Sequence, residues 1–189
     1  MITKAIQTTH LNCTLSEEHI KQYEDIILKL HYKLETVSDL TGWLHYPQQN
    51  HEELLTQIEQ VAAEIRQEAD VLIVVGVGGS FLGARAILDA LTPYFGRQMQ
   101  GIEVIYVGQN MSGAYINQLL KYIVDKRVYV NVISKSGGTM EPALAFRAMR
   151  QYMEGKYGER EAARRIIVTT DAEKGILKGI ADKAGYRQF

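Results

Sequence analysis

A short apolar run followed by a glycine-rich turn constrains the fold of this chain most strongly. Val71 to Val75 is an unbroken apolar run that shows no alternation with polar residues. Such runs are typical of strands buried on both faces, as in parallel sheets. Similar segments occur at 102–107, 128–133 and 166–169. The sequence therefore predicts a parallel β-sheet.

Helical segments are predicted after these strands, at about 81–91, 113–122, 141–157 and 173–184. Strands that alternate with helices in this way are typical of an α/β fold. Right-handed crossovers place such helices on both faces of the sheet. We therefore predict a three-layer α/β/α sandwich around a parallel sheet, and assume the flavodoxin-like strand order 2-1-3-4-5.

The residues before the first strand are predicted to be helical. Apolar residues recur at helical spacing from Ile20 to Leu34 and again from Leu54 to Ile65. The stretch between them, 40–50, is predicted to be a loop. We expect an N-terminal helical region, 1–69, that packs on a sheet domain, 70–189.

The composition argues against several classes of function. The chain has 21 Lys and Arg against 22 Asp and Glu, a net charge of −1, so binding to nucleic acid or to a membrane surface is not expected. The single cysteine, Cys13, allows no intrachain disulfide. The histidines lack the spacing of metal ligands, and we predict neither a metal nor another cofactor. The N-terminus does not read as a signal peptide, so a cytoplasmic location is expected.

A glycine-rich loop, 76–80, follows the first predicted strand and precedes a helix. Such a turn exposes backbone N–H groups at a helix N-terminus, which favours an anion, usually phosphate. The dinucleotide-binding fingerprint fails because Phe81 stands where a glycine is required. The Walker A pattern fails because Gly83 is followed by Ala84 and not by lysine. The alternative is a tight turn that binds no ligand.

The third predicted strand ends in a loop, 134–139, with three hydroxyls and one ammonium group. Hydroxyl, N–H and ammonium donors together suit a phosphate monoester. The alternative is a loop whose Ser and Thr side chains only cap the helix that follows. If the first and third strands are neighbours, loops 76–80 and 134–139 face one crevice. A small phosphorylated ligand is then the leading hypothesis.

Two other motifs are given structural interpretations. Thr170 and Glu173, after the fourth strand, have the spacing of a capping box. Arg164 and Arg165, just before that strand, are interpreted as a solvated helix end.

The two loops resemble the signatures of one enzyme family. Residues 75–86 are similar to the G-[IV]-G-G-S-x-L-G-x-R signature of the glucose-6-phosphate isomerase family, and residues 133–142 to its S-K-[ST]-x-T-T-x-E loop. Segments around Gly42-Trp43 and 168–171 resemble the bacterial branch. The resemblance runs from about residue 15 to Phe189.

This resemblance implies a sugar isomerase (SIS) fold, with the chain corresponding to N-terminal helices and a first SIS domain that is truncated at its last strand. It implies a sugar-phosphate site for glucose 6-phosphate or fructose 6-phosphate. Residues of both loops would hold the phosphate: Gly79, Ser80, Ser134, Lys135, Ser136, Gly137, Gly138 and Thr139. Gly138 stands where the family usually has Thr, which removes one possible hydroxyl.

The implied activity is the interconversion of glucose 6-phosphate and fructose 6-phosphate by a full-length homodimer. The general base and the ring-opening residues of the family are expected beyond Phe189, so no catalytic residue is expected here and the fragment alone is expected to be inactive. Two alternatives stay open. The chain could be a non-catalytic SIS module that senses a sugar phosphate, or an SIS aminosugar-phosphate isomerase domain.

Overall fold

The computed structural model describes residues 17–36, 41–93 and 101–189. They belong to two compact units, 1–51 and 52–189. The first unit contains α1 (Glu17–Thr36), α2 (Gly42–His45) and a 3₁₀ helix (Tyr46–Gln48). The prediction of a loop over 40–50 is therefore wrong for 42–48. Pro47 does not prevent the 3₁₀ helix because it stands in the first turn, where its missing N–H costs nothing.

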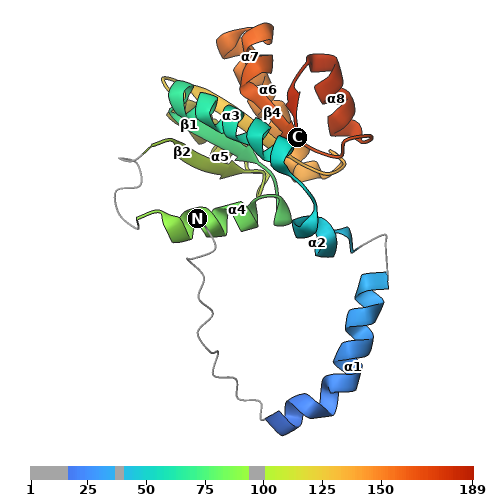
Figure 1. Cartoon of the computed structure of the whole chain (residues 1–189). Helices are drawn as coiled ribbons and strands as arrows, with labels where there is room; N and C mark the ends of the chain where they lie inside the picture. Colours follow the sequence, from blue (N-terminus) through green and yellow to red (C-terminus); the bar gives the residue numbers. More distant parts are fainter. Residues whose placement is uncertain (1–16, 37–40, 94–100) are drawn as a thin grey trace. The chain divides into compact units, whose positions relative to one another are not determined.

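The second unit alternates strands and helices, as Figure 1 shows. Its elements in chain order are α3 (Glu52–Glu68), β1 (Val71–Val75), α4 (Gly79–Leu91), β2 (Glu103–Val107), α5 (Gly113–Tyr122), β3 (Val128–Ile133), α6 (Met140–Tyr157), α7 (Glu159–Arg165), β4 (Ile166–Thr169), α8 (Ile176–Ala184) and β5 (Arg187–Gln188). The predicted strands and helices are confirmed, and α7 is an addition that Gly158, with φ 75°, separates from α6.

The five strands form one parallel sheet in the order β2-β1-β3-β4-β5. This confirms the α/β class and the assumed strand order. Val75, the last residue of β1, pairs with Val132 of β3, so the two strands end side by side. The boundary proposed between residues 69 and 70 stays a prediction, although α3 lies in the same compact unit as the sheet.

Side chains alternate between the two faces of the sheet. Val71, Ile73 and Val75 of β1 belong to a large core, whereas Leu72 packs against a smaller one. Residues of α5, α6 and α8 complete the large core, and Ile65 of α3 completes the small one. Helices therefore cover both faces, and α3 lies across the sheet in Figure 1.

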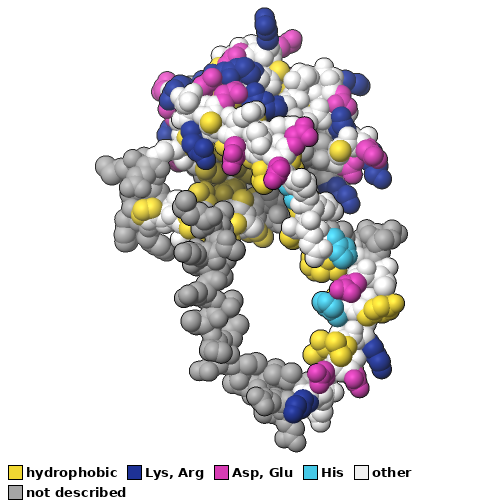
Figure 2. Space-filling model, viewed as in Figure 1, with side chains coloured by type: hydrophobic (Ala, Val, Ile, Leu, Met, Phe, Trp, Pro, Cys, Tyr) yellow, Lys and Arg dark blue, Asp and Glu magenta, His cyan; other side chains and the backbone are white. Residues whose placement is uncertain are grey.

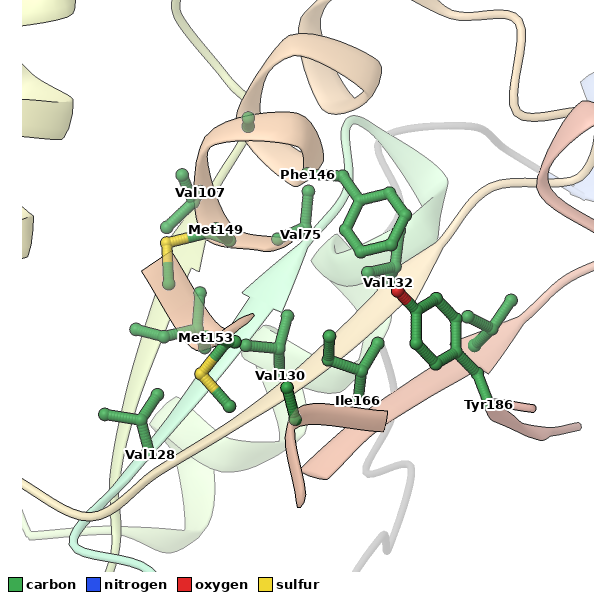
Figure 3. Packing of buried hydrophobic residues seen from close by; sticks show 14 of the residues in the cluster. Val75, Val107, Val128, Val130, Val132, Phe146, Met149, Met153, Ile166 and Tyr186 are labelled. Carbon is green, nitrogen blue, oxygen red and sulfur yellow. The ribbon is translucent and has the colours of Figure 1, made fainter. Parts of the chain in front are cut away.

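The large core is built from branched strand residues and long helix side chains (Figure 3). Met149 and Met153 of α6 are fully buried over the sheet. Phe146 meets the edge of Tyr186, with ring centroids 6.2 Å apart and an interplanar angle of 74°. Such edge-to-face pairs stabilise a core beyond their buried area. This packing fixes the start of α6, which follows the loop at the end of β3.

The small core carries a polar centre at Tyr129. Its hydroxyl lies 2.9 Å from Glu64 Oε1 and 2.8 Å from Glu68 Oε2, and accepts a hydrogen bond from Arg164 Nη1 at 2.9 Å. Burial raises the pKa of Tyr129, so the hydroxyl keeps its proton. Hydrogen bonds from Arg164 and Tyr129 lower the pKa of Glu68, so that carboxylate stays charged. The cluster ties α3 and α7 to the start of β3.

Arg165 corrects one interpretation made from the sequence. Its side chain is only 12% exposed, and its guanidinium lies 4.9 Å from the centre of the Tyr129 ring. The Arg164-Arg165 pair is therefore not a solvated helix end, because a cation–π contact and the carboxylates of α3 draw both side chains inward.

The surface of the sheet-containing unit carries charges of both signs, interspersed on the face seen in Figure 2. Among the residues that the structure describes, every helix is too short or too polar to cross a lipid bilayer.

Replacing Tyr129 by Phe should lower the free energy of unfolding by about 1–2 kcal/mol, because its Glu64 and Arg164 partners lose the hydroxyl. Tyr115→Phe is the matched control, since its hydroxyl makes a single bond to the Tyr106 carbonyl at 3.3 Å. Urea unfolding of both variants measures the difference. Equal loss of stability in the two variants would contradict a special role for the Tyr129 cluster.

Candidate anion-binding site

The two predicted loops lie next to each other at the carboxyl edge of the sheet. We call residues 76–80 the glycine loop and residues 134–139 the serine loop. They follow β1 and β3, which are paired side by side up to Val75 and Val132. A Cβ on Gly76 would lie 3.4 Å from the carbonyl oxygen of Ile133. The two backbone segments are therefore in contact where they leave the sheet.

The loop after β2 packs against the glycine loop and the start of α6. Gly108 has φ 102°, and a Cβ there would lie 3.2 Å from the Gly76 carbonyl oxygen and 3.3 Å from Pro142 Cα. Only glycine combines that backbone conformation with so close an approach. The ends of β1 and β2 and the start of α6 are therefore packed backbone against backbone.

The glycine loop leads directly into α4. Gly78 adopts φ 58°, and the helix begins at Gly79, two residues before the predicted start. Gly79 is exposed, and a Cβ on it would meet no atom within 4 Å. The first N–H groups of a helix have no acceptor within the helix, although the Ser80 N–H donates to the Val77 carbonyl at 3.3 Å. Open space therefore lies beside the Gly79 N–H at the positive end of α4.

Two serine side chains shape the serine loop from within. Ser134 is buried, and its Oγ accepts a hydrogen bond from the Gly137 N–H at 3.0 Å. Ser136 is exposed, and its Oγ accepts from the Gly138 N–H at 3.1 Å. Each hydroxyl accepts in these bonds, so its proton is available to an acceptor.

Thr139 discriminates between the two interpretations of this loop. It is the N-cap residue of α6, yet its side chain makes no capping hydrogen bond. By contrast, Ser112 at the N-cap of α5 accepts from the Tyr115 N–H at 3.3 Å. The interpretation of the loop as a set of helix caps is therefore wrong for Thr139, whose side chain is exposed.

All the predicted site residues come from these two loops, and the structure brings the loops together at one edge. Lys135, Gly138 and Thr139 are exposed, and Ser80 and Gly137 are half-buried. The chemical groups present are N–H donors, hydroxyls and one ammonium group. Such a set can neutralise and hydrogen-bond an anion. Within 17–36, 41–93 and 101–189, no three His, Cys, Asp or Glu side chains gather to hold a metal ion.

A cavity of about 330 Å³ lies beside the serine loop, between α6 and α8. Val132, Phe146 and Leu177 give it apolar walls, Ser134 and Gly137 border it, and Arg147 and Arg150 also line it. The exposed donors of the serine loop, Lys135, Gly138 and Thr139, do not line this cavity. The anion site predicted from the sequence is therefore distinct from it.

Thr170 has a role that the sequence did not indicate. Its hydroxyl lies 2.8 Å from the Ser134 carbonyl oxygen and 3.1 Å from that of Lys135. The predicted capping box with Glu173 is wrong, because α8 begins at Ile176 behind Gly175. Local spacing could not reveal this contact, since it joins loops after two different strands.

Replacing Gly137 by Ala should disrupt the serine loop. Gly137 has φ 74°, and a Cβ there would lie 2.5 Å from the Leu177 backbone nitrogen. Left-handed backbone at a residue other than glycine costs about 1–3 kcal/mol before any clash. Gly138→Ala is the control, because its Cβ would meet only Ser136 Oγ at 3.5 Å. Thermal unfolding should separate the two variants, and an equally stable Gly137→Ala would refute this packing.

Comparison with known proteins places these loops in a wider context. A family model described as phosphoglucose isomerase matches residues 49–188. Glucose-6-phosphate isomerases from Staphylococcus aureus strains NCTC 8325 / PS 47 and Newman are 41% identical to this chain over 177 residues. The match covers 92% of this chain and 40% of each relative. The chain thus spans less than half the length of these relatives.

Solved structures show the same architecture. A hypothetical protein from Thermus thermophilus superposes with a TM-score of 0.77 at 23% identity, over 91% of this chain and 40% of that one. A glucose-6-phosphate isomerase from Chlamydia trachomatis gives a TM-score of 0.59 at 25% identity, over 73% of this chain and 25% of that one. The first likeness concerns the fold alone.

Proposed function

Because the chain belongs to the phosphoglucose isomerase family, we propose that its glycine and serine loops bind the phosphate group of a hexose 6-phosphate. The donors would be the Gly79 N–H, the Ser80 hydroxyl and the polar groups of 134–139. The relatives named above carry glucose 6-phosphate in their names, which supports this choice of ligand.

The observation that carries the proposal is the side chain of Thr139. A hydroxyl at an N-cap normally satisfies an N–H group of its own helix. At Thr139 it makes no such bond, although Thr139 is exposed at the N-terminus of an 18-residue helix. A phosphate oxygen there would accept from the hydroxyl and from the first N–H groups of α6, and the positive end of the helix would stabilise its charge.

Lys135 and the glycine loop add complementary donors. The ammonium group supplies a full positive charge, and the backbone N–H groups supply direction. Hydrogen bonds to a charged group contribute about 1.5–3 kcal/mol each, more than bonds between neutral groups. A ligand without the phosphate would therefore lose most of these contacts.

We further propose that the longer protein interconverts glucose 6-phosphate and fructose 6-phosphate. Aldose–ketose isomerisation needs a base that moves a proton between C1 and C2 and an acid that opens the ring. In the proposed division, 70–189 is the first SIS domain and holds the phosphate, while regions of the relatives that this chain does not span supply the base and the acid. The family resemblance also favours a cytoplasmic homodimer as the working form.

Calorimetry with glucose 6-phosphate and glucose tests the binding proposal. The phosphorylated sugar should bind at least about tenfold more tightly, the equivalent of one charge-assisted hydrogen bond. Thr139→Val should weaken glucose 6-phosphate binding by about 1–2 kcal/mol and leave stability unchanged, because no capping bond is lost.

Ser112→Ala is the matched control for Thr139→Val. It removes a true cap, so it should lower stability by about 1 kcal/mol and leave binding unchanged. Equal affinity for glucose and glucose 6-phosphate would overturn the proposal. If Thr139→Val loses stability but keeps its affinity for glucose 6-phosphate, the Thr139 side chain has a purely structural role.

The 189-residue chain alone should not isomerise fructose 6-phosphate. Glu141 is the single carboxylate among residues 134–142 and 76–80, and it lies in the first turn of α6. At that position its carboxylate interacts with the positive end of the helix dipole, and we do not expect it to act as the base at the reacting carbons. A coupled assay for glucose 6-phosphate measures turnover directly. Robust turnover that disappears in Glu141→Gln would contradict this division of roles.

A further inference from the structure

The serine loop is held from behind by the residues that connect β4 to α8. We call residues 170–176 the β4–α8 segment. The carbonyl groups of Ser134, Lys135 and Ser136 all accept hydrogen bonds from it. We propose that Thr170 is a positioning residue that orients the serine loop for the phosphate group, an inference that rests on the proposed function of that loop.

The contacts involve each of these carbonyl groups in turn. The Thr170 hydroxyl lies nearer to the Ser134 oxygen, at 2.8 Å, than to the Lys135 oxygen, at 3.1 Å. Since the hydroxyl has one proton, it donates to one of them at a time. The Asp171 N–H donates to the Lys135 oxygen at 3.3 Å, and the Ile176 N–H donates to the Ser136 oxygen at 2.8 Å.

Peptide geometry converts this restraint into a direction for the donors. In a trans peptide unit the N–H points away from the C=O, and the chain has no cis peptide bond in its described residues. Holding three successive carbonyls toward the β4–α8 segment therefore turns the N–H groups of Lys135, Ser136 and Gly137 to the opposite side. The Gly137 N–H accordingly reaches Ser134 Oγ, inside the loop.

The β4–α8 segment is itself anchored, so it can act as a fixed support. The Thr170 N–H donates to the carbonyl of Phe189 at 3.0 Å, which ties it to the residue that follows β5. Asp171 Oδ1 accepts from the N–H groups of Glu173 and Lys174, and these bonds lower the pKa of Asp171. The turn therefore keeps its shape without help from a ligand.

Thr170 is the residue where this support can be tested, because it supplies the side-chain donor. The Asp171 and Ile176 contacts are made by backbone N–H groups that a substitution leaves in place. Removal of the Thr170 hydroxyl leaves the Ser134 carbonyl, the first in the loop, without this hydrogen-bond donor. Both carbonyl contacts of this hydroxyl join loops and not elements of the sheet.

The experiment compares Thr170→Val with Thr170→Ser and with Thr169→Val. Val keeps the shape of Thr but lacks the hydroxyl, whereas Ser keeps the hydroxyl. Thr169 is a neighbouring half-buried threonine, whose hydroxyl donates to Asn131 Oδ1 at 3.3 Å. Two readouts are taken on the 189-residue chain: the Kd for glucose 6-phosphate and the exchange rates of the amides of 135–138.

Thr170→Val should weaken glucose 6-phosphate binding about five- to tenfold, the scale of one neutral hydrogen bond. Its loop amides should exchange several-fold faster, since local opening becomes easier. Thr170→Ser should match the wild type in both readouts, and Thr169→Val should change neither. If Thr170→Val does not fold, Thr170→Ala takes its place with the same expectations.

The two readouts separate failure of this inference from failure of the proposed function. If the wild type does not bind glucose 6-phosphate, the proposed function is wrong, and faster exchange in Thr170→Val alone still supports the positioning role. If Thr170→Val retains the wild-type Kd and loop exchange, the positioning role is overturned. The same holds if Thr170→Ser behaves like Thr170→Val.

Discussion

The parallel pairing of β1 with β3 is the interaction on which the rest of the structure depends. Both strands are covered on both faces, and Ile73 and the next residue of β1, Val74, are both buried. Apolar burial of this kind contributes about 1.5–3 kcal/mol for each large side chain. Because the two strands run in register to Val75 and Val132, the glycine and serine loops must leave the sheet side by side. The candidate site is thus a consequence of the core.

Much of this arrangement could be predicted from local patterns. Predominantly apolar runs marked the four longer strands, and Val71 to Val75 is unbroken, since a strand covered on both faces needs apolar residues at most positions. The loops could be assigned to one ligand class because glycines, hydroxyls and a lysine stand together before helices. The strand order had to be assumed, because no local pattern in the sequence indicates that Val75 pairs with Val132.

The contacts that the sequence did not reveal join residues far apart in the chain. Thr170 has the spacing of a cap with Glu173, but its hydroxyl finds carbonyl acceptors 35 and 36 residues away. Arg165 stands in a charged helix end, yet the ring of Tyr129 and the carboxylates of α3 make burial favourable. Such contacts depend on which strands become neighbours, so they follow from the fold and not from the segment.

The central claim is that the glycine and serine loops form a single anion site. A titration of the labelled chain with glucose 6-phosphate, followed by amide chemical shifts, tests it most directly. The account predicts that the amides of Gly79, Ser80 and 135–139 shift together with one common Kd. Shifts confined to one loop, or centred on the cavity at Phe146 and Leu177, would contradict it.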